Sequence, residues 1–526
     1  MRLSRTISLV TAFAISIALS VTLTDRVGMY SDDGVYTAAA KSLAEHRTYR
    51  LINVPREPYE TKAPPGYPAL LSAVWKVNPR FPQNVYALKT LNLCFIAVAL
   101  ITIAVLTARW SSDAEWLALV PVAVQGVIAT NAMFVAFADY LMSDLLFTAL
   151  ALMVLVLCSS ARNSTSRTRE AIIVGLVSFA ILTRSLGVAL AAAVVLDSIL
   201  EKRYRSAIVR ALVPGLAFGA WMLWAAIHRL NQTALIDYYQ TYEDPAVAHL
   251  LRNPRLAWEI VSGNLRFVRD AMPWVLGPIW LIAWPFIVGL IGVGAWRMLR
   301  SSHRPMILFV ACYVPLIVVH PFASYRYLMP IAPIMIVALA AGTAEAWSVL
   351  SHSGRIRALS SRAAFAVLLL IIIGNLTWLQ YRYRPGDQLR DWTGRNLGYR
   401  WSGFDETFTW VKQNTPQDAR LGSVFDSMYY LYTGRKGLRP WIQRPETYFY
   451  PYGQAVPSVG DVHIVAKELD LLGIDYLVID PSGNYPESDA AIALMKQIVA
   501  LPDVNGRRVF ISSDGQHEVF QLWGGP

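Results

Sequence analysis

Long apolar runs alternate with short polar connectors over the first 380 residues of the chain. A helix of about 20 apolar residues crosses a bilayer core of roughly 30 Å. Runs of this kind lie near 7–23, 89–108, 116–137, 144–159, 171–182, 186–200, 207–228, 272–296, 306–320, 328–347 and 363–380. The pattern predicts a polytopic α-helical membrane protein with about eleven transmembrane helices. The pair 171–182 and 186–200 is short, and a shallow hairpin there is the alternative.

The first run, 7–23, follows Arg2 and Arg5 and so resembles a secretion signal. It is longer than a typical signal core, and Ala18-Leu19-Ser20 is a weak cleavage site. We interpret this run as a retained first span.

Basic residues mark one side of the predicted membrane. If the N-terminus is cytoplasmic, every inside connector is basic, as the positive-inside rule requires. The connectors carry Arg109; Arg162, Arg167 and Arg169; Lys202, Arg203 and Arg205; Arg297, Arg300 and Arg304; and Arg355, Arg357 and Arg362. This orientation places five parts of the chain on the outer face of the membrane: the loop 24–88, the turn 183–185, the segment 230–271, the link 320–327 and the tail.

The last 145 or so residues change character, because short amphipathic helices alternate with apolar strands. Helices are expected at 404–413, 427–432, 462–472 and 490–500, and strands at 420–426, 474–479, 508–512 and 517–522. The alternation predicts a small α/β domain. We therefore divide the chain into a membrane domain, 1–380, and a soluble outer domain, 381–526.

Composition supports a membrane protein: the 526 residues are 55% hydrophobic and 16% charged, whereas soluble domains average roughly 25% charged. The net charge of +11 resides mostly in the connectors, so we expect membrane lipids and not nucleic acid as partners. Cys94, Cys158 and Cys312 lie in apolar runs without a CxxC neighbour, which argues against a disulfide framework or a zinc site. No nucleotide-binding glycine motif or HExxH pattern occurs.

The loop 24–88 carries the sharpest chemical signal. Asp32 and Asp33 come directly after the first span and before a helix expected at 35–44, and the loop closes with Lys62-Ala63-Pro64-Pro65-Gly66-Tyr67-Pro68. A carboxylate beside another carboxylate tends to have a raised pKa, which would suit Asp32 to proton transfer near neutral pH. The alternative is that the acidic pair only caps the helix.

Two arginines sit where an unpaired charge is costly, and both are therefore candidate site residues. Arg184 separates two short apolar runs, and Arg326 stands between Tyr325 and Tyr327. The alternatives are a structural pair of Arg184 with Asp139 or Asp144, and a role of Arg326 as an interface anchor.

These motifs, in this order, resemble the glycosyltransferase C superfamily. The matching residues are the acidic pair with Tyr36, the Lys-x-Pro-Pro-Gly-Tyr-Pro element, and the segments 140–147, 183–187 and 325–330, with looser likeness at 408–420 and 430–435. The nearest branch is the bacterial one that contains protein O-mannosyltransferase-like and lipid A aminoarabinose transferase-like enzymes. In the aminoarabinose transferase pattern the Lys directly precedes the prolines, whereas here Ala63 intervenes.

The resemblance implies transfer of a hexosyl or pentosyl group from a polyprenyl-phosphate donor to a cell-envelope acceptor: a glycan, a lipid or a protein. It implies Asp32 as the base, with Asp33 as an alternative base or, together with Asp32, as a ligand of a divalent cation. Lys62, Arg184 and Arg326 would bind the donor phosphate. Substrate contacts or a lid are expected from Tyr36, Tyr67, Tyr239, His249, His320, Tyr325 and Tyr327.

Two other classes of function fit the composition. A polytopic transporter or lipid flippase would favour charges near the middle of the bilayer and broken helices in related halves, whereas the informative charges here gather on one side. A non-catalytic membrane scaffold would use its tail to bind cell-wall partners and would tolerate replacement of Asp32.

Overall fold

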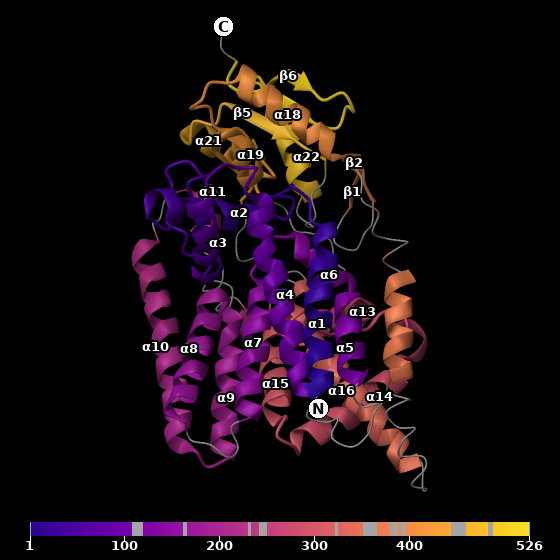
Figure 1. Cartoon of the computed structure of the whole chain (residues 1–526). Coiled ribbons are helices and arrows are strands. Elements are labelled where there is room, and N and C mark those ends of the chain that lie inside the picture. Colours follow the sequence, from indigo (N-terminus) through magenta and orange to yellow (C-terminus); the bar gives the residue numbers. More distant parts are fainter. Residues whose placement is uncertain are drawn as a thin grey trace.

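The computed structural model describes residues 2–107, 119–160, 166–229, 233–240, 250–320, 324–350, 365–377, 379, 388–390, 396–442, 459–481 and 488–524. A body of long helices carries a small sheet at one end, and the N-terminus lies at the opposite end of the body (Figure 1). The fold is therefore mostly helical with an α/β portion near the C-terminus, as the sequence predicts.

The helices of the body follow the apolar runs, except that most of α13 lies within 230–271, which was predicted as an outer segment. They are α1 Arg2–Leu19, α4 Val85–Thr107, α5 Leu119–Ala129, α6 Ala132–Asp139, α7 Asp144–Ser159, α8 Arg167–Thr183, α9 Val188–Leu200, α10 Tyr204–His228, α13 Pro254–Leu276, α14 Trp280–Leu299, α15 Arg304–Val318 and α16 Ala332–Leu350, followed by a helix at Phe365–Thr377. Short 3-10 turns are η1 Ser20–Thr22, η4 Ser185–Gly187 and η5 Tyr325–Leu328. Within the described residues, three helices (α4, α10 and α14) are long and apolar enough to cross a membrane. The count of eleven spans stays a prediction.

Two predicted runs are not single straight helices. The run 116–137 divides into α5 and α6, which meet at an angle of 58° and form a fourth candidate span if they count as one. The run 272–296 corresponds to one candidate span with shifted bounds, because α13 ends at Leu276 and the span α14 begins at Trp280. The break falls at Gly277, whose φ of +80° is open mainly to glycine, and Pro278 follows it.

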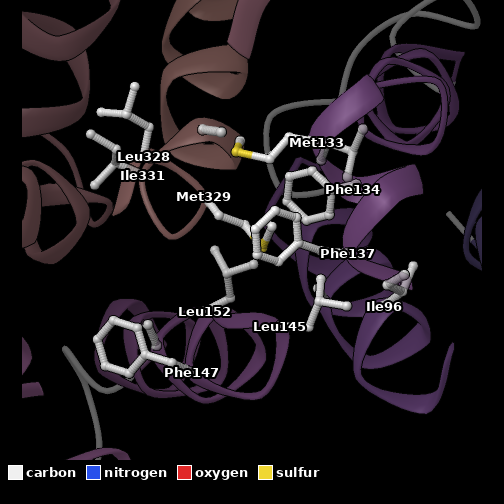
Figure 2. Packing of buried hydrophobic residues seen from close by; sticks show 14 of the residues in the cluster. Ile96, Met133, Phe134, Phe137, Leu145, Phe147, Leu152, Leu328, Met329 and Ile331 are labelled. Carbon is white, nitrogen blue, oxygen red and sulfur yellow. The ribbon is translucent and has the colours of Figure 1, made fainter. Parts of the chain in front are cut away.

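A well-packed apolar core holds the upper part of the body together. Figure 2 shows Ile96 of α4, Phe137 of α6 and Leu145 of α7 packing near Met329, which follows η5. All are buried. Because such cores are close-packed, the residues beside them in sequence, Asp144 and Arg326 among them, are held in fixed positions.

The loop 24–88, called the first outer loop after its predicted side of the membrane, forms its own helical layer between the body and the sheet (Figure 1). Helix α2, Ser31–Lys41, begins four residues before the predicted start, so that Asp32 and Asp33 lie in its first turn. The π-helical turn η2, Ser42–His46, and helix α3, Gly66–Val77, follow. The short helix α11, Ala234–Gln240, joins this layer from the segment 230–271.

The C-terminal sheet has five strands in the order β4-β3-β5-β7-β6, parallel from β4 to β5 and antiparallel from β5 to β6. The strands are β3 Leu421–Ser423, β4 Gly437–Leu438, β5 Tyr476–Ile479, β6 Arg507–Ile511 and β7 Glu518–Gln521, and a separate antiparallel pair is formed by β1 Gln388–Arg390 and β2 Asn396–Arg400. The helices are α18 Trp401–Asn414, α19 Asp426–Thr433, α21 Val462–Leu471 and α22 Ser488–Val499. The predicted helices and the terminal hairpin are confirmed. The strand predicted at 420–426 is shorter in the structure, since β3 spans only Leu421–Ser423 and α19 begins at Asp426. The two-residue strand β4 was not predicted.

A buried ion pair fixes the start of the first outer loop. Lys89 of α4 is fully buried, and its Nζ donates hydrogen bonds to Asp139 Oδ1 at 2.7 Å and to the carbonyls of Thr24 and Arg26 at 2.8 and 2.7 Å. Asp139 also accepts hydrogen bonds from the backbone N–H and the hydroxyl of Thr24, at 2.6 and 2.8 Å. The pair ties the loop to α4 and to the end of α6.

We predict that Lys89→Met destabilises the protein strongly, because it leaves the Asp139 carboxylate buried without its cation. Breaking such a pair costs about 3–5 kcal/mol. The thermal midpoint in detergent measures the loss. The control is Arg255→Ala, which removes a mostly exposed helix pair with Glu259 worth about 0.3–0.5 kcal/mol. Equal midpoints for the two variants would contradict the structural role of Lys89.

Candidate functional site

Asp32 and Arg326 form an ion pair that joins the first outer loop to the turn η5. Arg326 Nη1 donates to Asp32 Oδ2 at 2.6 Å, although the two residues are 294 positions apart. The Asp32 side chain keeps 43% of its surface exposed, and that of Arg326 keeps 18%. The pair is thus held in place yet accessible from one side.

The ion pair shifts the pKa of Asp32 in the direction opposite to the prediction. Burial alone would raise that pKa, but the Arg326 guanidinium, with smaller contributions from the charges of Lys62 and Arg439, lowers it below its ordinary value. The prediction that Asp33 raises the pKa of Asp32 is therefore wrong, because the cations outweigh one neighbouring carboxyl group. Asp32 is ionised at neutral pH.

Asp33 has the opposite environment. Its side chain is buried and turns back onto the backbone, where Oδ2 accepts the N–H of Gly28 at 3.0 Å and Oδ1 accepts the N–H of Gly34 at 2.8 Å. Burial raises the pKa of Asp33 to about 7 against the effect of these hydrogen bonds. Asp33 therefore shapes the entry into α2, while Asp32 faces the cations.

Lys62 is presented by a turn that Glu60 organises. Glu60 is buried, and its Oε1 accepts the backbone N–H groups of both Lys62 and Ala63 at 2.8 Å. The half-buried Lys62 lies close enough for its charge to lower the pKa of both Asp32 and Glu60. Burial nevertheless raises the pKa of Glu60 to about 7.

Sequence reasoning missed Glu60. The available signal was an acidic residue two positions before the lysine of the proline-rich element.

Arg184 is paired with Asp144 and does not face Asp32 directly. It ends α8, and its guanidinium bonds Asp144 Oδ1 at the start of α7. Its Cζ also lies 5.3 Å from the centre of the Tyr327 ring, while the Cζ of Arg326 lies 5.5 Å from the same centre. Of the two structural partners considered for Arg184, the structure selects Asp144. Phosphate binding by Arg184 stays a prediction.

The two candidate tyrosines of the first outer loop, Tyr36 and Tyr67, differ in their surroundings. The Tyr36 hydroxyl lies 3.4 Å from Ser143 Oγ, and the Tyr36 ring stands edge-on to that of Tyr67, with centres 5.5 Å apart. Tyr67 is fully buried and donates to Asn92 Oδ1 at 3.1 Å. Tyr67 therefore fixes α3 to α4, and half-buried Tyr36 is the better placed of the two to meet a substrate.

The aromatic residues around Arg326 divide in the same way. The ring of Tyr325 packs against that of Phe267, with centres 4.7 Å apart, and so serves to hold η5 on α13. The ring centres of His320 and Tyr327 are 4.7 Å apart. The guanidinium groups of Arg184 and Arg326 both lie near the Tyr327 ring. His320 and Tyr327 thus belong to the Arg326 cluster.

Tyr239 lies apart from this cluster, on α11. Its hydroxyl accepts the backbone N–H of Arg439 at 2.8 Å, and its ring centre is 5.9 Å from the Arg439 Cζ. Arg439 follows β4 and is a residue that the sequence did not mark, although its charge reaches Asp32. His249 lies outside the described residues.

The acidic pair does not fit a divalent-cation site. Both oxygens of Asp33 accept backbone N–H groups, and Asp32 faces Arg326. In the described part of the chain, no three or more His, Cys, Asp or Glu side chains gather as metal ligands.

Known proteins resemble this chain in structure and not in sequence. No protein-family model matches it, and no curated protein matches its sequence. Among solved structures, ArnT from Cupriavidus metallidurans bound to undecaprenyl phosphate is similar, with a TM-score of 0.55, 14% sequence identity, and coverage of 98% of this chain and 99% of that chain. At this level of identity the likeness concerns the fold. The chain therefore shares the fold of ArnT, and this agrees with the fold that its motifs predicted.

Proposed function

We propose that the protein is a membrane glycosyltransferase that moves a sugar from a polyprenyl-phosphate donor to a cell-envelope acceptor. The Asp32–Arg326 pair, with Lys62 beside it, carries the proposal. It puts a carboxylate and cations together at the end of an apolar helical body, where a lipid-anchored phosphate would lie. The fold shared with a protein bound to undecaprenyl phosphate supports this donor class. We place the site and the C-terminal domain on the outer face of a bacterial inner membrane.

The reaction is a substitution at the anomeric carbon. The acceptor oxygen forms a bond to that carbon, the bond from carbon to phosphate oxygen breaks, and the polyprenyl phosphate leaves with the electron pair. The acceptor proton passes to Asp32, which its cations keep ionised. A carboxylate of low pKa can take this proton once the new bond has drawn electron density from the hydroxyl oxygen.

The cations stabilise the departing phosphate. A guanidinium has five N–H donors, so Arg326 can hold Asp32 and a phosphate oxygen together, and Lys62 adds a point charge. Preorganised donors aimed at developing charge supply a large part of enzymatic rate enhancement. Glu60 serves this step indirectly by folding the turn that carries Lys62.

We predict that Asp32→Asn lowers transfer about 10²- to 10⁴-fold, the usual contribution of a positioned proton acceptor. The measurement is transfer of label from a panel of radiolabelled polyprenyl-phosphate sugars in membranes that contain acceptor. Asp25→Asn is the control, because Asp25 is an exposed acid of the same loop. Equal transfer by Asp32→Asn and wild type would refute Asp32 as base, and no transfer by wild type from any donor would favour the transporter or the scaffold.

We predict that Lys62→Met lowers kcat about 10²- to 10³-fold, as removal of one donor to a developing oxyanion does, and that Lys62→Arg restores part of it. The exposed Lys76 of α3 provides the control variant, Lys76→Met. If Lys62→Met raises only KM, Lys62 binds the donor without stabilising the leaving group.

We predict a pH-dependent stability difference between wild type and Glu60→Gln. The folded pKa of Glu60, about 7, exceeds its ordinary value of 4.5, so the folded state favours the protonated form. Wild type is therefore most stable relative to the variant below pH 4.5 and loses that advantage as the pH rises to about 7, by up to about 1.4 kcal/mol per pH unit. Thermal midpoints in detergent across this range measure it, and a constant difference would show that the pKa of Glu60 is not raised.

A further inference from the structure

The C-terminal domain bonds the first outer loop through a buried carboxylate, Asp426. Its side chain is fully buried at the start of α19, and it accepts Asn53 Nδ2 at 2.9 Å and Arg439 Nε at 3.1 Å. The backbone N–H of Gly437 donates to the carbonyl of Asn53 at 2.7 Å. Asn53 is thus held through its side chain and its backbone by two neighbouring parts of the domain.

The same turn of α19 touches the helix that carries Asp32. A Cβ added to Gly34 would collide with Ser427 Oγ, and one added to Gly28 would collide with Met428. The backbone at Gly34 of α2, and at Gly28 just before this helix, therefore lies directly against side chains of α19. Asp33 strengthens the arrangement, because it binds the N–H groups of both glycines.

The Asp426 network also reaches the turn that presents Lys62. Tyr239 of α11 accepts the backbone N–H of Arg439 at 2.8 Å, and its hydroxyl bonds the Asp426 carboxylate. Next to Tyr239 at the C-terminal end of α11, the carbonyl of Gln240 accepts the Thr61 hydroxyl at 2.9 Å. One carboxylate of the C-terminal domain is therefore connected to both sides of the site.

The N-terminus of α11 is held by the domain as well. Glu468 accepts the backbone N–H groups of Ala234 and Leu235 at 3.0 and 2.8 Å, where a carboxylate is favourable. Helix α11 is thus fastened between the domain and the first outer loop.

We propose that Asp426 is a positioning residue of the transferase site, which sets Asp32 and Lys62 relative to each other by fastening α2 and α11 to the C-terminal domain. The inference rests on the proposed function and adds that the domain is a working part of the site. A buried carboxylate that bonds Asn53, Arg439 and Tyr239 together holds all of them in one arrangement. Loss of its charge would let α2 and α11 shift, and displacements of about 1 Å at a site can lower rates about 100-fold.

The test uses the full-length protein with Asp426→Asn, which keeps the size of the side chain but removes the charge that holds Arg439. We expect kcat to fall about 10- to 100-fold with KM for the donor nearly unchanged. We also expect faster amide hydrogen exchange at 31–41, with exchange in α4 and α7 as in wild type. Asn53→Ala, which removes a partner of Asp426, should act in the same direction if Asp426→Asn fails to fold.

Lys436→Ala is the matched control. Lys436 pairs with Glu57 at 2.6 Å across the same interface, but the two side chains are 40% and 39% exposed, so its loss should change neither kcat nor exchange. Wild-type kcat in folded Asp426→Asn, or an equal effect of Lys436→Ala, would overturn the proposal. If wild type transfers no sugar, the proposed function fails, and unchanged exchange at 31–41 would then separately refute the fastening of α2 by Asp426.

Discussion

Where helices exclude water, a charged side chain needs a partner, and this constraint organises the end of the molecule that bears the site. An unpaired buried charge costs several kcal/mol. The structure meets the constraint with four ion pairs: Lys89–Asp139, Arg184–Asp144, Arg326–Asp32 and Arg439–Asp426. Each pair fastens a loop or turn to a helix that the apolar core already holds. The polar groups that are proposed to take part in the chemistry thus also hold the first outer loop in place.

Two adjacent carboxyl groups behave differently because their surroundings differ. Asp32 meets cations and has a lowered pKa, whereas Asp33 meets backbone N–H groups in a buried position and has a raised pKa of about 7. Such a separation of pKa values is a recurrent sign of divided roles. Here it separates a group that is ionised at neutral pH from one that shapes the backbone.

Much of the fold could be predicted from the sequence. Backbone N–H and C=O groups in an apolar medium must form their hydrogen bonds within helices, so each membrane helix is visible in the sequence as a long apolar run. The helices of the C-terminal domain followed from amphipathic periodicity in the same way. The break between α13 and α14 at Gly277 could have been predicted, since a Gly-Pro pair is a common end of a helix. The two-residue strand β4 was not, because its pairing with β3 leaves no periodic pattern.

Only part of the candidate site could be predicted from the sequence. Motifs marked Asp32, Lys62 and Arg326, but the direction of the Asp32 pKa shift depends on a contact between residues 294 positions apart. Glu60, Asp426 and Arg439 carry no motif, and their importance arises from partners that only folding supplies. Sequence patterns report local periodicity and element order, whereas ion pairs across the fold must be seen in three dimensions.

In the proposed mechanism, the Asp32–Arg326 pair would couple donor binding to the basicity of Asp32. With no anion nearby, the full charge of Arg326 acts on the carboxylate and lowers its pKa. A donor phosphate beside Arg326 would offset part of that charge, and the pKa of Asp32 would rise toward its ordinary value. Asp32 would then accept a proton more readily when the leaving group is in place than when the site holds only water. The arrangement favours the substrate-bound state for proton transfer without any movement of the backbone.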